Sequence, residues 1–251
     1  MNVEAVDQAL TTRRFGRRLF YQARVDSTMR RAAAVLQQKA LPEGAVFVAD
    51  EQSRGRGTAG RVWHSEREGL WLSCVFQEPL RAQPLSFLPG IALVDVLREH
   101  YGVDAHVKWP NDVLVGNRKI SGSLGESQRQ PDGRTAWVLG VGINVNQAAF
   151  APPIHDVAVS LRLATGQMES RELCLARFLG KLEELYDGAT DLVAEWRRRT
   201  QMLGRTVTAI RAGQEQDVQV LDLTPEGHLV VALPNGVRET LVAAVDLRLR
   251  V

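Results

Sequence analysis

The residues best suited to chemistry lie in one glycine- and arginine-rich stretch, Asp50 to Ser65, with the sequence DEQSRGRGTAGRVWHS. Its glycines let backbone N–H groups approach a ligand closely, and its arginines offer planar forks that suit carboxylate and phosphate oxygens. The stretch is too glycine-rich for a helix and too charged for a buried strand. If structureless, it is also longer than most loops of a compact domain. The pattern predicts an anion-binding loop, with a solvated basic loop as the alternative. The residues concerned are Gly55, Gly57, Gly60, Arg56 and Arg61.

A second group of polar residues lies in VKWPNDVLVGNRKISG, residues 107–122. Lys108, Asn111 and Asp112 cluster at a break between two predicted strands, and Lys119 begins the next strand. Asp112 could hold a magnesium ion through its oxygens, and Lys119 could bind a carboxylate or phosphate as a point charge. A plain hairpin with Asn111 and Asp112 as turn residues explains the same pattern equally well.

Two weaker signals come from GVGINVN, residues 140–146, and from DST, residues 26–28. Two glycines in a buried strand indicate that something packs flush against the backbone. Asn144 could form a two-way hydrogen bond to an adenine edge, but taken alone it is better explained as a buried asparagine bonded to backbone. Ser27 is a good helix N-cap, which is a sufficient structural reason for it and is compatible with a ligand contact.

The elements that must position these residues alternate between strands and helices. We expect strands at 17–25, 44–50, 69–76, on both sides of Trp109-Pro110-Asn111, at 119–127 and at 135–146, and helices at 29–40 (capped by Asp26 or Ser27), 86–101, 170–186 and 191–199. After Gly204 the pattern holds only short strands, joined by turns at 225–227 and 234–236. This change places a boundary near residue 201, with a small β-barrel behind it.

The composition of the 251-residue chain is that of an ordinary globular protein, with 45% hydrophobic residues and a net charge of +2. Nothing global therefore points to nucleic acid or an anionic membrane. Cys74 and Cys174 are predicted to be buried thiols in a reducing compartment. Residues 137–154 make a poor membrane span, and the N-terminal residues do not resemble a secretory signal. We expect a soluble cytoplasmic protein with no membrane partner.

Taken together, these segments resemble the biotin–protein ligases. The resemblance runs through the whole chain in order: DST, QSRGRGTAGRVWHS, LWLS, KWPNDV, RKISG, GVGINVN and the β-barrel. The pairing of KWPNDV with the Gly-Arg loop is its most specific part, since the related lipoate ligases and octanoyl transferases lack that loop. The resemblance implies an α/β (α+β) fold: a mixed-sheet catalytic domain of the biotin/lipoate ligase type at 1–200, and a small SH3-like β-barrel at 201–251.

The resemblance also implies an activity. The family uses ATP and Mg²⁺ to convert biotin to biotinyl-5'-AMP, then transfers biotin to a lysine on the carboxyl carrier domain of a biotin-dependent carboxylase. By the family pattern the catalytic residues are Lys119, Arg56 and Asp112, and Asp112 serves the metal or the incoming lysine. The biotin-binding residues are Ser27, Thr28, Gln52, Arg56, Gly57, Thr58, Ser73 and Lys119. The nucleotide-binding residues are Gly55, Arg61, Trp63, Lys108, Asn111 and Asn144. The Gly-Arg loop is expected to close over the adenylate.

Three positions depart from the family pattern. The family usually has Arg at Thr58, Asn at Met29, and aliphatic residues where this chain has Ser123-Leu124-Gly125 before Glu126. We therefore expect the adenylate to be held more loosely than in relatives with the arginine. The departures leave a non-catalytic biotin or adenylate sensor open as an alternative, and a lipoate or octanoate acyl transferase of the same fold is a third.

Some relatives carry an N-terminal helix-turn-helix and act as repressors. Here the DST segment begins at residue 26, which leaves no room for such a domain within this sequence. Arg13, Arg14, Arg17 and Arg18 form a small basic cluster that is better interpreted as a solvated face. We expect no nucleic-acid binding, and either a monomer or a homodimer.

Overall fold

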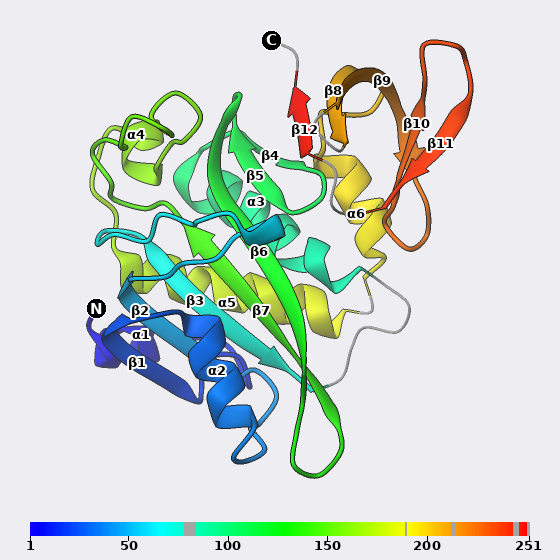
Figure 1. Ribbon diagram of the computed structural model, residues 1–251. Coiled ribbons are helices and arrows are strands. Elements are labelled where there is room, and N and C mark those ends of the chain that lie inside the picture. Colours follow the sequence, from blue (N-terminus) through cyan, green and yellow to red (C-terminus); the bar gives the residue numbers. More distant parts are fainter. Residues whose placement is uncertain (78–83, 189, 212–213, 243–245, 250–251) are drawn as a thin grey trace.

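The main layer is a seven-stranded mixed sheet in the order β1-β2-β3-β7-β6-β5-β4 (Figure 1). The computed structural model describes residues 1–77, 84–188, 190–211, 214–242 and 246–249. β1 pairs with β2 in parallel, and the other neighbours are antiparallel. The strands are β1 (Leu19–Val25), β2 (Val46–Gln52), β3 (Leu70–Phe76), β4 (Ala105–Lys108), β5 (Asp112–Val115), β6 (Arg118–Arg129) and β7 (Thr135–Ile143).

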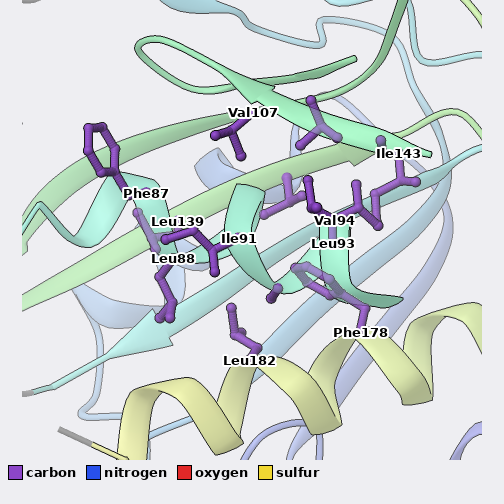
Figure 2. Packing of buried hydrophobic residues seen from close by; sticks show 14 of the residues in the cluster. Phe87, Leu88, Ile91, Leu93, Val94, Val107, Leu139, Ile143, Phe178 and Leu182 are labelled. Atoms are coloured by element: carbon purple, nitrogen blue, oxygen red, sulfur yellow. The ribbon is translucent and has the colours of Figure 1, made fainter. Parts of the chain in front are cut away.

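Helices cover both faces of this sheet because its central strands are apolar on both sides. On one face, α3 (Leu88–Tyr101) and α5 (Arg171–Asp187) pack over a core that contains Ile91, Leu139 and Phe178 (Figure 2). On the other face, α2 (Thr28–Leu36) packs on β2, β3 and β7. Alternate side chains of β2 divide between the two cores: Val46 and Val48 face α3 and α5, and Phe47 faces α2.

The C-terminal part is a five-stranded antiparallel sheet in the order β11-β10-β9-β8-β12. Its strands are β8 (Thr206–Arg211), β9 (Gln214–Leu223), β10 (Leu229–Ala232), β11 (Arg238–Leu241) and β12 (Asp246–Leu249), and it follows α6 (Leu192–Arg199). Buried Trp109 joins it to the main sheet by donating from Nε1 to the Gly227 carbonyl at 2.9 Å. The expected fold class is confirmed, and the division at residue 201 stays a prediction.

Most predicted elements are present with shifted ends, and three were missed. The helix expected at 29–40 is shorter, and β7 stops at Ile143, so residues 144–146 lie outside the strand in which they were expected. The missed elements are α1 (Val3–Ala9), α4 (Leu161–Thr165) and β12. α1 packs on α5, which is a tertiary contact that a seven-residue pattern does not reveal.

The N-terminal basic cluster contributes to the fold. The buried Glu183 carboxylate accepts hydrogen bonds from the backbone N–H groups of Arg13, Arg14 and Phe15 at 2.6, 2.9 and 2.8 Å. Arg13 and Arg14 also pair with Asp187. Burial would raise the pKa of Glu183, but these donors hold that pKa below its usual value.

The two cysteines are free and buried, as expected. Desolvation by burial raises the pKa of the Cys174 thiol to about 12, and it raises the pKa of Cys74 further. Both thiols are therefore unreactive at neutral pH. No helix within the described parts of the chain is both long and apolar enough to cross a bilayer.

Candidate active site

A cavity of about 670 Å³ opens on the α2 face of the main sheet, which is within the usual range for small-molecule sites. It brings together four segments far apart in sequence: the start of α2, the Gly-Arg loop, the β4–β7 strands and the loop after β7. Most of the predicted site residues line it, namely Ser27, Thr28, Gln52, Arg56, Gly57, Thr58, Arg61, Trp63, Lys108, Asn111, Asp112, Lys119 and Asn144. Gly55 and Ser73 were also predicted but lie behind this lining.

The Gly-Arg loop is a narrow hairpin and is therefore not structureless. The Trp63 N–H donates to the Gly55 carbonyl at 3.0 Å, and the Gly57 N–H donates to the Arg61 carbonyl at 2.8 Å. At the tip, Ala59 has a φ of 55°, in the left-handed region. This packing requires a glycine at residue 55, since a Cβ atom there would lie 2.3 Å from the Trp63 carbonyl oxygen, and the nucleotide contact of Gly55 stays a prediction.

Three cations of the cavity, Lys119, Lys108 and Arg56, already face carboxylates. Lys119 Nζ lies 2.6 Å from Asp112 Oδ1, and Lys108 Nζ lies 3.9 Å from the other oxygen of the same carboxylate. Asp112 and Lys119 lie on neighbouring antiparallel strands, β5 and β6, which explains why residues seven apart meet. Arg56 makes a 2.8 Å ion pair with Glu126, further along β6. An anionic ligand must therefore compete with the protein's own carboxylates.

Trp63 lies flat on glycine residues of the main sheet. A Cβ atom at Gly142 would lie 2.3 Å from Trp63 Nε1, and one at Gly122 would lie 3.1 Å from its ring. Lys119 Nζ lies 4.9 Å from the Trp63 ring centroid, and Trp71 packs edge-on at 6.5 Å. The Trp63 Nε1 atom is buried without an acceptor among the described residues. The predicted flush packing is thus confirmed, and its occupant is a side chain of the protein.

A compact polar cluster closes the other end of the cavity. Gln52 Oε1 accepts from the Thr28 N–H at 2.9 Å and from its hydroxyl at 3.2 Å, while Gln52 Nε2 donates to Ser65 at 2.9 Å. Ser73 lies behind Thr28 and donates to its hydroxyl at 2.8 Å. Ser27 occupies the N-cap position, but its side chain makes no capping hydrogen bond, so the prediction of a Ser27 cap is wrong. Gln52, which lies on β2, instead accepts a hydrogen bond from the Thr28 N–H at the start of the helix.

Two of the asparagines that line the cavity, Asn111 and Asn144, fix its backbone. The Asn111 amide donates to the Ser123 carbonyl. Asn144 Nδ2 donates to the Lys119 carbonyl at 3.3 Å and to the Val159 carbonyl at 3.1 Å. This geometry supports the alternative explanation of Asn144 as a buried asparagine bonded to backbone. Its predicted adenine contact would need an amide nitrogen that already has two acceptors.

Sequence reasoning missed one wall of the cavity. The loop after β7 pairs with β6, because the Lys119 N–H donates to the Val157 carbonyl at 2.7 Å. Its apolar lining residues include Phe150, Ile154 and Val157, and Leu247 of the C-terminal sheet also lines the cavity. The signal in the sequence was the apolar, proline-containing run directly after a glycine-rich strand.

Comparison with known proteins agrees with this geometry. Residues 21–146 match the model of the biotin/lipoate A/B protein ligase family. The bifunctional ligase/repressor BirA of Bacillus spizizenii is 32% identical over 249 residues, which cover 95% of this chain and 76% of that protein. The chain belongs to the biotin/lipoate A/B protein ligase family. The biotin–[acetyl-CoA-carboxylase] ligase of Paracoccus denitrificans is 31% identical, covering 88% of this chain and 97% of the relative.

Solved structures of this family are also similar to the chain. The biotin protein ligase of Aquifex aeolicus in complex with biotin and ATP matches with a TM-score of 0.77 and 26% identity, covering 93% of this chain and all of that chain. The structure of the Leishmania major ligase in complex with biotinyl-5-AMP has a TM-score of 0.63 at 21% identity, which shows the shared fold.

The magnesium ion that the family pattern implies fits this site only together with a nucleotide. Within the described ranges no group of three or more His, Cys, Asp or Glu side chains is placed to hold a metal ion. Asp112 offers one carboxylate, and two lysine ammonium groups already face it. Mg²⁺ commonly binds through one or two carboxylates and the phosphates of its substrate. Asp112 therefore suits a magnesium ion that arrives with ATP.

Proposed function

We propose that the chain is an ATP-dependent biotin–protein ligase, which forms biotinyl-5'-AMP and transfers biotin to a lysine of a biotin carboxyl carrier domain. The observation that carries the proposal is the joint placement of two clusters in one cavity. The polar cluster around Thr28 and Gln52 suits a hydrogen-bonding head group, and the lysines around Asp112 suit a carboxylate beside phosphates. The names of the relatives agree with both substrates.

In the first step a biotin carboxylate oxygen attacks the α-phosphorus of ATP, and the bond from that phosphorus to the pyrophosphate leaving group breaks. Both reactants are anions, so their approach must be stabilised by positive charge. Lys119 and Arg56 supply it once the incoming anions displace Asp112 and Glu126. Asp112 would hold the magnesium ion that arrives with ATP, and that ion would neutralise further phosphate charge. Removing one preorganised group that stabilises developing charge costs roughly 10²- to 10³-fold in rate.

In the second step the neutral amine of the carrier lysine attacks the acyl carbon, the bond from that carbon to the phosphate oxygen of AMP breaks, AMP leaves, and the proton of the amine passes to Asp112. Asp112 is the cavity carboxylate that we assign to this step, because it lies beside Lys119 and Lys108 and a carboxylate can accept the proton of the attacking amine. The protein contributes mainly position and charge in both steps.

The polar cluster favours biotin over lipoate. The bicyclic head of biotin carries a urea, which can both donate and accept hydrogen bonds. The dithiolane ring of lipoate has neither an N–H group nor an oxygen. A site built for a hydrogen-bonding substrate rejects an analogue without those groups, because its own buried polar atoms then lose partners. Thr28, Ser73 and Gln52 bond to one another, and the urea of biotin offers this cluster further donors and acceptors that lipoate lacks.

A non-catalytic sensor is the second candidate, and turnover separates it from the ligase. The test is incorporation of labelled biotin into a purified carrier domain with Mg-ATP, for wild type and Lys119→Ala. We expect transfer by wild type that falls at least about 100-fold in Lys119→Ala. Lys39→Ala, at an exposed lysine outside the cavity, is the matched control and should transfer normally. Tight biotin binding without any transfer would reject the ligase in favour of the sensor.

A further inference from the structure

Met29 forms an apolar end wall of the cavity, next to the polar cluster. It is the second residue of α2, and its side chain is only 5% exposed. It lines the cavity and packs into the smaller core with Phe47, Val75 and Val138. The side of Met29 that faces away from the cavity is therefore held in place by packing in this core.

Met29 takes the place that a side chain at residue 140 would need. A Cβ atom at Gly140 would lie 2.6 Å from Met29 Sδ and 2.7 Å from its Cγ. Leu124, which pairs with Gly140 in the β6–β7 register, packs against the same cluster. The position and reach of the Met29 thioether thus depend on the missing side chain at Gly140.

Thr28, the residue before Met29, lies at the same end of the cavity. Thr28 carries the hydrogen bonds to Gln52 and Ser73 that make this end of the cavity polar. Consecutive residues therefore present a hydrogen-bonding surface and a soft apolar surface to the same end of the ligand. A head group that satisfies Thr28 must also fit against Met29.

We propose that Met29 is a specificity-determining residue that limits the size of the substrate head group, and that Gly140 sets its position. The inference rests on the proposed function, since the head group is taken to be that of biotin. Met29 excludes head groups that are larger than the bicyclic head of biotin. Thr28 and Gln52 form the hydrogen bonds to the urea.

The first experiment compares biotin, by calorimetric binding, with two analogues that each carry one extra methyl group on a ring carbon of the bicyclic head, so that both urea N–H groups remain. Wild type should discriminate against both. One extra methylene in a tight pocket changes selectivity by roughly 10- to 200-fold. Met29→Ala should therefore reduce the preference for biotin over at least one analogue by about 10- to 100-fold. Met168→Ala is the matched control, because Met168 is 64% exposed and does not line the cavity.

The second experiment tests the pair and does not depend on Met29→Ala alone. Gly140→Ala should push the flexible thioether into the cavity and weaken biotin binding at least about tenfold, as an overpacked contact does. In the Met29→Ala background, Gly140→Ala should weaken biotin binding by less than about threefold, because the effects of substituting two residues in contact are coupled.

Three outcomes are decisive. Loss of selectivity in Met29→Ala, together with rescue of Gly140→Ala in the double variant, supports the inference. If wild type binds biotin but the selectivity of Met29→Ala is unchanged, or the two alanine effects simply add, the role of Met29 is rejected and the proposed function stands. Absence of biotin binding by folded wild type rejects the proposed function, and this inference falls with it.

Discussion

Adding a single methyl group at Gly142 should displace Trp63 from the main sheet. The new Cβ atom would lie 2.3 Å from Trp63 Nε1 and 2.5 and 2.8 Å from two ring carbons. An indole ring is rigid, so the contact cannot be relieved by a change in one side-chain torsion near its end. Either the ring slides off the strand with the Gly-Arg hairpin, or β7 moves.

The size of the effect follows from the kind of contact. Overpacking a well-packed site typically costs about 1–3 kcal/mol, and for a chain of this length each kcal/mol lowers Tm by roughly 2–4 °C. Trp63 also lies beneath the Lys119 ammonium group, whose nitrogen is 4.9 Å from the ring centroid. Such a contact is worth roughly 0.5–2 kcal/mol, so adenylate formation should slow by about two- to thirtyfold when the ring leaves.

The assay combines thermal unfolding, tryptophan fluorescence and pyrophosphate release for Gly142→Ala. The chain has five tryptophans, so the signal of Trp63 is obtained as the difference between each protein and its Trp63→Phe counterpart. Gly180→Ala is the control, because a Cβ atom there meets only the Thr11 hydroxyl, at 3.3 Å on the opposite layer. Unchanged Tm, fluorescence and rate in Gly142→Ala would refute the placement of Trp63 on the glycine and with it the account of the cavity.

Three further perturbations follow from the same contacts. Glu126→Gln removes the carboxylate that faces Arg56, so the apparent KM for ATP should fall about two- to fivefold at low salt; an unchanged KM would contradict competition between this carboxylate and the ligand. Thr58→Arg should slow dissociation of the adenylate about tenfold or more in a filter or fluorescence assay, and an unchanged rate would reject our expectation of a loosely held intermediate. Because the pKa of Glu183 is lowered in the folded protein, its ionised form contributes stability that is full above the usual value of 4.5 and is lost as the pH falls through the lower folded pKa. Urea unfolding of Glu183→Gln should therefore show lower stability than wild type at pH 7 and a weaker loss of stability below pH 4.5; parallel curves would contradict this.

The sequence predicted the sheet well because the pattern that builds it is local. Strands β3 and β7 are apolar over most of their length and β2 is apolar over residues 46–49, and glycine or polar residues limit these runs at one end or both. Gly140 and Gly142 also predicted that something packs flush against this strand, and both line the cavity because residues two apart share one face of a strand. Local composition was sufficient for both conclusions.

The contents of the site were harder to predict, because they depend on contacts between distant segments. Nothing near Asn144 in the sequence indicates that its amide will meet the Val159 carbonyl. The hairpin in the Gly-Arg loop depends on packing of Trp63 against the main sheet, and composition alone favoured an open loop. Phe150 and Ile154 were overlooked for a different reason, since the run that contains them, residues 137–154, was weighed only as a membrane span.

The structure also bears on whether the departures from the family pattern disable the site. Asn111 bonds to the backbone of Ser123, so this contact does not require an aliphatic side chain there. Thr58 accepts from the Arg61 guanidinium through its hydroxyl at 2.8 Å and through its carbonyl at 3.2 Å. A guanidinium group therefore remains at the tip of the hairpin even though residue 58 lacks one. Met29 fills the space left above the sheet by Gly140. Each departure is matched by a contact that preserves shape or charge, whereas a scaffold released from catalysis has no need to retain the pairing of Lys119 with Asp112. This pattern favours a working ligase with altered selectivity over a sensor.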